Sequence, residues 1–132
     1  MFLLSHHPPE EYDRCYRVGG LHFCARCLGT YPVMFAAIAA QFWAGAPLEL
    51  PWDVPVGLAL VAPATLDWAW GRRQPHRFSN AWRSFTGVLL GLGLARSLFI
   101  HLQRPLPPVL LAQLSLVTAV ALAVIFMTYL RR

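Results

Sequence analysis

Long apolar segments separated by short polar breaks dominate this chain and predict helices that cross a membrane. The breaks are rich in proline, glycine and arginine, and proline and glycine interrupt or end helices. Four spans are expected, at residues 28–46, 56–70, 81–102 and 109–130. The second, at about 15 residues, is shorter than the roughly 20 that a bilayer requires, so a tilted or re-entrant helix is the alternative there. We therefore expect an all-α integral membrane protein with a helical bundle over residues 28–132 and an N-terminal Cys/His loop segment over residues 1–27.

The composition agrees with a membrane protein of one domain. Of the 132 residues, 57% are hydrophobic and 13% are charged, whereas an average soluble domain has roughly 25% charged residues. No basic stripe with interleaved aromatic residues remains outside the expected spans, so we expect no nucleic-acid partner. Membrane lipid is the expected surrounding.

The arginines predict an orientation, and the chain contains no lysine. In a four-span arrangement only Arg104 lies in a loop on the far side, while Arg96 lies inside the third span and is expected to extend outward to the membrane surface. The remaining nine share one side: Arg14, Arg17, Arg26, Arg72, Arg73, Arg77, Arg83, Arg131 and Arg132. The positive-inside rule then places both termini in the cytoplasm. We expect a multi-pass topology in the inner (cytoplasmic) membrane.

All the cysteines lie before the first expected span, together with three histidines. Cys24 and Cys27 form a C-x-x-C motif, which supplies two of the four N or S ligands of a tetrahedral zinc site. Cytoplasmic thiols stay reduced, which makes a structural disulfide an unfavourable interpretation. We expect a Cys₃His zinc site whose cysteine ligands are Cys15, Cys24 and Cys27 and whose fourth ligand is His6 or His7. His22 is a second-tier candidate, because it lies only two residues from Cys24.

Two other interpretations of the cysteines stay open. They could be small buried apolar side chains, or the C-x-x-C could carry out thiol–disulfide chemistry. The sequence does not predict the thioredoxin-like setting, in which a strand precedes the motif. The zinc interpretation explains how residues 1–27, which have few large apolar side chains, obtain folding free energy.

Two further features lie within the expected spans. Asp67 is an acid in the second span and needs a polar partner. Arg83 and Asn80 lie at a similar depth at the start of the third span, and we expect a structural Asp67–Arg83 pair in preference to an ion or substrate pathway. Gly87 and Gly91 are spaced by four residues, which allows a close approach of helices.

No arrangement typical of a hydrolase, a metalloprotease or a phosphate-binding loop is present, so we expect a protein that is not an enzyme. The expected function is an accessory or assembly subunit of a larger membrane complex, with other membrane protein subunits as partners. The alternative is a membrane protein that handles a metal or a thiol redox couple through the C-x-x-C itself.

The segment Cys24-Ala25-Arg26-Cys27-Leu28-Gly29-Thr30-Tyr31 resembles the C-A-R-C-x-G-x-Y signature of an uncharacterised bacterial family of predicted membrane proteins, domain of unknown function 2085. Other positions fit the same family pattern: His6 or His7, Pro8, Pro9, Arg14, Pro63, Asp67, Asn80, Arg83, Thr86 and Gly87. The resemblance covers roughly residues 5–95. Many members have a cysteine where this chain has Ser5, and Cys15 is the substitute ligand that this difference implies. The family implies a membrane fold and a shared cysteine motif, without a settled activity.

Overall fold

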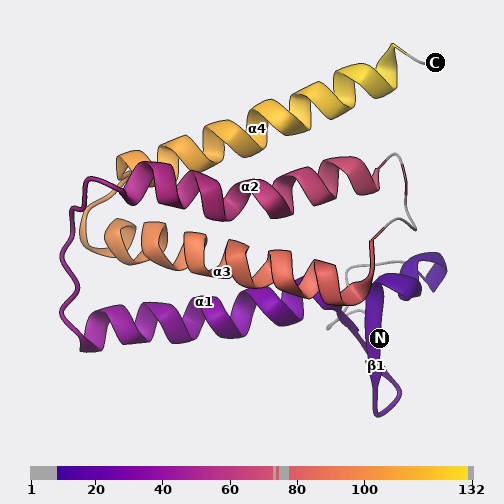
Figure 1. Cartoon of the computed structure of the whole chain (residues 1–132), viewed down its shortest axis with the longest axis horizontal. Helices are drawn as coiled ribbons and strands as arrows, with labels where there is room; N and C mark the ends of the chain where they lie inside the picture. Colours follow the sequence, from indigo (N-terminus) through magenta and orange to yellow (C-terminus); the bar gives the residue numbers. More distant parts are fainter. Residues whose placement is uncertain (1–8, 73, 75–77, 131–132) are drawn as a thin grey trace.

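Four long helices and a small N-terminal hairpin make up the computed structural model, which describes residues 9–72, 74 and 78–130. The helices occupy the four apolar segments of the sequence (Figure 1). Their bounds are α1 (Ala25–Trp43), α2 (Asp53–Gly71), α3 (Asn80–Gln103) and α4 (Pro108–Tyr129). α2 has 19 residues and continues through Pro63, so this helix is longer than the segment expected from the sequence.

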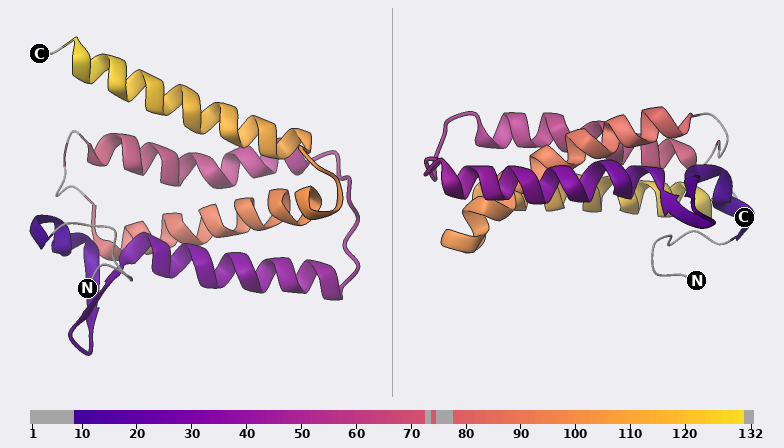
Figure 2. Two further views of the ribbon diagram at one scale, coloured as in Figure 1. Left: turned by 180° about the vertical axis from the view of Figure 1, so that it is seen from behind. Right: turned by 90° about the horizontal axis from the view of Figure 1, so that it is seen from below.

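The helices lie side by side in an order that differs from the order of the sequence. α3 lies between α1 and α2, and α4 packs on the other side of α2 and diverges from it toward the C-terminus (Figures 1 and 2). The amide of Gln113 in α4 fastens this arrangement, because its Nε2 donates hydrogen bonds to the carbonyl oxygens of Gly57 at 3.3 Å and Gly93 at 3.1 Å. Consecutive helices run in opposite directions, so the N-terminal hairpin and the end of α4 lie at the same end of the bundle.

The N-terminal segment contains regular structure where a loop was expected. A 3₁₀ helix, η1 (Pro9–Arg14), leads into strands β1 (Cys15–Val18) and β2 (Leu21–Cys24), which pair in antiparallel fashion. Gly19 and Gly20 connect the strands with φ values of +57° and +80°. Positive φ at both central residues is what a two-residue hairpin turn of type I′ requires, and glycine adopts it without steric cost. The prediction of a loop was therefore wrong for the residues of the two strands.

The start of α3 fastens this hairpin to the bundle. Asn80 Nδ2 donates to the carbonyl oxygens of Asp13 at 3.0 Å and Cys15 at 3.3 Å. Ser84 Oγ donates to the carbonyl oxygen of Ala25 at 2.9 Å. The Asn80 side chain thus holds the N-terminal segment in place, a role different from the pairing with Asp67 that was considered for it.

Two helices of the described chain, α3 and α4, are long and apolar enough to cross a membrane. Only 11% of the most apolar stretch of α4 is buried inside the protein, against 44% for α3. An apolar helix with so little internal packing needs an apolar surrounding such as lipid or another protein. Of the two candidate spans, α4 is therefore the one with the more open apolar surface.

The end of the bundle opposite the hairpin is electrically balanced by ion pairs. Arg96 Nε and Nη2 contact the two carboxylate oxygens of Asp53 at 2.7 and 2.9 Å, and Arg104 pairs with Glu49. Arg96 Nη1 also donates to Gln41 Oε1 at 3.4 Å. The expectation that Arg96 extends outward was wrong, because its guanidinium finds a bidentate carboxylate partner inside the bundle, which is a stronger interaction than a solvated position offers.

The Asp53 carboxylate predicts an acid-sensitive step in stability. Burial alone would raise its pKa, but the hydrogen bonds from Arg96 and from the Leu50 N–H, together with the Arg96 charge, lower the pKa below the ordinary 3.8. A lowered pKa gives stability that is present above the unfolded-state pKa and lost as the pH falls through the folded-state pKa. We expect the free energy of unfolding to decline below about pH 4 in the native chain. In Asp53→Asn the decline should be shallower when denaturation is followed from pH 6 to pH 2, and an equal slope in both proteins would contradict this role of the pair.

Candidate functional site

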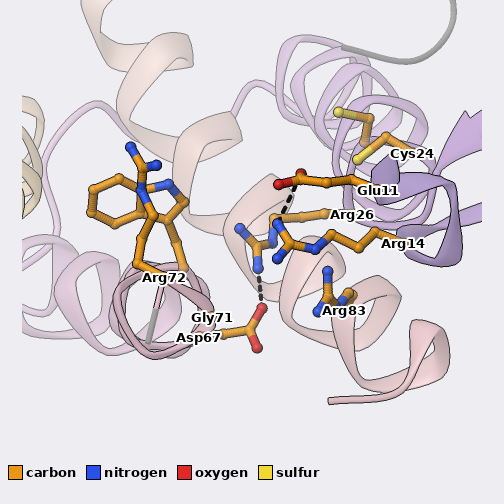
Figure 3. Close-up of a pocket in the computed structure, with 10 residues that line it drawn as sticks. Glu11, Arg14, Cys24, Arg26, Asp67, Gly71, Arg72 and Arg83 are labelled. Carbon is orange, nitrogen blue, oxygen red and sulfur yellow. Dashed lines mark hydrogen bonds and ion pairs between the residues drawn. The ribbon is translucent and has the colours of Figure 1, made fainter. Parts of the chain in front are cut away.

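A cavity of about 520 Å³ lies at the hairpin end of the bundle, where η1, β2 and the ends of three long helices meet (Figure 3). Its lining is mainly charged, with two thiols and one aromatic ring added. The lining residues are Glu11, Arg14, Cys24, Arg26, Cys27, Asp67, Trp68, Gly71, Arg72 and Arg83. The cavity therefore combines both chemistries that the sequence singled out, the cysteine motif and the acid of α2.

Asp67 is buried in this cavity and forms an ion pair with Arg26 from the first turn of α1. Its side chain is only 3% exposed, and that of Arg26 is 24% exposed. Arg83 is buried in the same cavity and interacts electrostatically with Asp67. The structure thus places the expected partner close to Asp67 and adds Arg26, which the sequence reasoning did not consider as a partner.

Two more arginines complete the positive lining. Arg14 Nη1 contacts Glu11 Oε2 at 3.0 Å within η1 (Figure 3). Arg72 follows the last residue of α2, and its guanidinium carbon lies 5.6 Å from the centre of the Trp68 ring, within the range of a cation–π contact. These residues reach the cavity from separate elements, so the positive charge of the cavity comes from the tertiary fold and is not visible as a run in the sequence.

The three cysteines gather beside this cavity. Cys15 and Cys24 are direct partners across the β1–β2 ladder, so their side chains point to the same face of the hairpin. Cys24 ends β2, and Cys27 lies in the first turn of α1, with the two thiols in hydrogen-bond contact. Cys15 and Cys24 are buried and Cys27 is half-buried. The fold thus brings all three thiols to one corner.

The pKa of the Cys27 thiol is raised above its ordinary value. The hydrogen bond with Cys24 is the largest cause, followed by burial and by electrostatic interaction with Cys24, while the Arg26 charge acts in the opposite direction. A thiol with a raised pKa is a weak nucleophile at neutral pH. Yet a strand does precede the C-x-x-C, contrary to the sequence-based expectation, since β2 ends at Cys24 and α1 begins at the next residue.

The histidines do not complete a metal site in the described chain. The His22 ring stacks on Tyr12 with ring centres 4.0 Å apart. His6 and His7 lie outside the described residues. Within residues 9–72, 74 and 78–130, no group of three or more His, Cys, Asp or Glu side chains is arranged to hold a metal ion.

The sequence reasoning missed three of the four arginines that line the cavity. Arg14, Arg26 and Arg72 were used as topology signals, and Arg14 and Arg26 also as positions of the family pattern, but none of the three was assigned to a site. The sequence did contain a signal for Arg26 as a partner of Asp67. Arg26 lies inside the C-x-x-C motif, just before the first expected span, and this position predicts a depth in the membrane similar to that of Asp67. What the sequence does not show is which helices are neighbours.

Comparisons with known proteins agree with this architecture. The family described as Predicted membrane protein (DUF2085) matches residues 10–99, a range that contains the whole cavity lining. No curated protein and no solved structure matches the chain significantly. The matched range covers the hairpin, α1, α2 and most of α3, and α3 is one of the two helices apolar enough to cross a membrane. The chain therefore belongs to the DUF2085 family of predicted membrane proteins.

Proposed function

We propose that this protein crosses the bacterial inner membrane four times, with both termini in the cytoplasm, and serves as an accessory or assembly subunit of a larger membrane complex. The charge distribution supports this orientation. The two arginines at the far end, Arg96 and Arg104, are each matched by a carboxylate, whereas the hairpin end carries a surplus of arginine. An uncompensated positive end is the one that the positive-inside rule keeps in the cytoplasm.

The proposed role as a subunit is supported by α4, which exposes large apolar side chains along its length. Leu111, Leu114, Leu122 and Ile125 are all exposed, and the helix packs mainly on α2. Such a helix can contact lipid on one side and a neighbouring membrane protein on another, while few of its contacts within the bundle are given up.

The corner that the three cysteines share is the observation that carries the second part of the proposal, a structural zinc ion, although the described side chains there are not arranged around a metal. Cys15, Cys24 and Cys27 would supply three thiolate ligands, which is a donor set that zinc prefers. The fourth ligand would be His6 or His7. Zinc would replace the thiol–thiol hydrogen bond and tie the hairpin to the start of α1, since the three cysteines belong to β1, β2 and α1.

A second candidate function is thiol–disulfide exchange, which the order strand, C-x-x-C, helix favours. In that case Cys24 and Cys27 would form the working pair, and Cys15 would be dispensable. The pKa of Cys27 is raised mainly by its hydrogen bond with Cys24, so in this candidate Cys24 would be the attacking thiol and Cys27 its partner in the disulfide.

Single cysteine replacements separate the two functions. For a zinc site we expect about one zinc per native chain and almost none in both Cys15→Ser and Cys27→Ser, because a three-ligand remnant binds structural zinc far more weakly. The measurement is elemental analysis of full-length protein purified in mild detergent, with His101→Asn at the opposite end as a control that should keep its zinc. Metal-free native protein with a reversible Cys24–Cys27 disulfide would overturn the zinc site.

A further inference from the structure

The charges that line the cavity do not balance. Four arginines, Arg14, Arg26, Arg72 and Arg83, face two carboxylates, those of Glu11 and Asp67, which leaves a surplus of two positive charges in the described lining. Like charges in a partly enclosed space repel one another, and the repulsion is stronger there than in water. A bound anion would remove this repulsion.

Several polar atoms at the cavity lack a partner in the part of the chain that the structure describes. Arg14 Nε and Arg26 Nε are buried donors without an acceptor, and Asp67 Oδ1 is a buried acceptor without a donor. Buried polar atoms are rarely left in this state, so each one points to a group that completes it. A completing group must accept hydrogen bonds from the guanidinium groups and donate one to the Asp67 carboxylate.

Phosphate chemistry meets both requirements. The unprotonated oxygens of a phosphate accept hydrogen bonds from guanidinium groups in a fork geometry that arginine matches well. Near neutral pH, inorganic phosphate also carries at least one hydroxyl, which can donate to Asp67, and the headgroup of phosphatidylglycerol carries hydroxyls as well. Sulfate and chloride are anions without such a donor, so they could accept hydrogen bonds from the arginines but could not donate one to Asp67.

The dimensions and location of the cavity agree with this ligand class. A volume of about 520 Å³ falls within the usual range of roughly 300–1,000 Å³ for small-molecule sites. The cavity lies between the ends of α1, α2 and α3, and basic pockets between spanning helices on the cytoplasmic side commonly bind anionic headgroups. Trp68 adds an apolar wall beside Arg72.

We propose that this cavity binds a phosphate-containing anion that also carries a hydroxyl donor, either free phosphate or the headgroup of an anionic phospholipid with a free hydroxyl. The assignment does not depend on the state of the cysteines. A zinc ion held by three thiolates and one histidine has a net charge of −1, which would still leave the described lining with a surplus of one positive charge.

The test uses full-length protein in a neutral detergent and measures binding of inorganic phosphate by calorimetry. Arg72→Gln removes a cavity charge from an exposed end of α2, where it should not impair folding, and we expect about 10-fold weaker binding. Arg17→Gln, an equal charge change on the exposed face of β1, is the matched control and should bind like the native chain. Glu11→Gln should bind several-fold more tightly, since it raises the surplus and releases Arg14.

Two further measurements test whether the ligand must donate a hydrogen bond to Asp67 and whether the phosphate comes from solution or from a lipid. Sulfate should bind at least about 10-fold more weakly than phosphate, because it leaves the Asp67 oxygen without a donor. Native mass spectrometry of protein from lipid discs that mix phosphatidylglycerol and phosphatidylcholine should show retained phosphatidylglycerol if the headgroup is the ligand, and phosphate binding alone if it is the free ion. The proposal is overturned if neither probe binds in preference to sulfate or phosphatidylcholine, or if Arg72→Gln and Arg17→Gln behave alike.

Discussion

Replacing Arg26 by glutamine is expected to lower the free energy of unfolding by about 3–5 kcal/mol, the usual cost of removing one partner of a buried ion pair. The reason is the burial of Asp67, whose side chain is 3% exposed and pairs with Arg26. Without Arg26 the almost fully buried carboxylate loses its ion-pair partner. The effect should appear as a lower unfolding midpoint when secondary structure is followed during denaturation of the protein in detergent.

The same chain offers a control with the same chemistry on the surface. Arg104 pairs with Glu49, and the two side chains are 60% and 79% exposed. Arg104→Gln should therefore cost only about 0–1 kcal/mol, as exposed ion pairs do. The double variant Arg26→Gln/Asp67→Asn should recover much of the loss, because it removes the buried charge as well. Additive losses in the double variant, or equal losses for Arg26→Gln and Arg104→Gln, would refute a coupled buried pair.

The helices were predictable because their signal is local. Long apolar runs end at glycine, proline and arginine clusters, and the structure places its four helices on those runs. The hairpin was also predictable in principle, because Gly19-Gly20 is a strong signal for a two-residue turn. It was missed because residues 15–24 are short and rich in cysteine and charge, so a loop that binds metal explained them equally well.

The polar contacts inside the bundle were less predictable because they depend on which helices are neighbours. The depth of Asp67 could be estimated from its distance to the end of the span, and that depth corresponds to the hairpin end of the bundle, where Asp67 lines the cavity. Its ion-pair partner Arg26 is 41 residues away in the sequence. Arg96 was assigned to the membrane surface for the same reason, since nothing in the sequence shows that the start of α2 brings Asp53 against α3.

The second large effect is expected at the contact of α1 with α3, where glycines let the two backbones approach. A Cβ atom at Gly91 would lie 2.5 Å from the Thr30 carbonyl oxygen, and one at Gly87 would clash with the Arg26 carbonyl oxygen. Thr30 Oγ1 adds a hydrogen bond across the contact, to the Gly87 carbonyl oxygen at 3.1 Å. Since backbone atoms cannot move aside as a flexible side chain can, Gly91→Ala should cost about 1–3 kcal/mol.

Gly71→Ala is the matched control, because Gly71 is also helical and a Cβ there would meet nothing within 4 Å. Alanine is the better helix former, so this control should be neutral or slightly stabilising in the same denaturation experiment. Gly87→Ala carries a further consequence, since the carbonyl group that it displaces belongs to Arg26, which pairs with Asp67 in the cavity. We therefore expect Gly87→Ala to weaken phosphate binding as well as stability, whereas Gly91→Ala, one turn farther from the cavity, should mainly reduce stability. Equal stability of Gly91→Ala and Gly71→Ala would show that the two helices do not rely on this close approach.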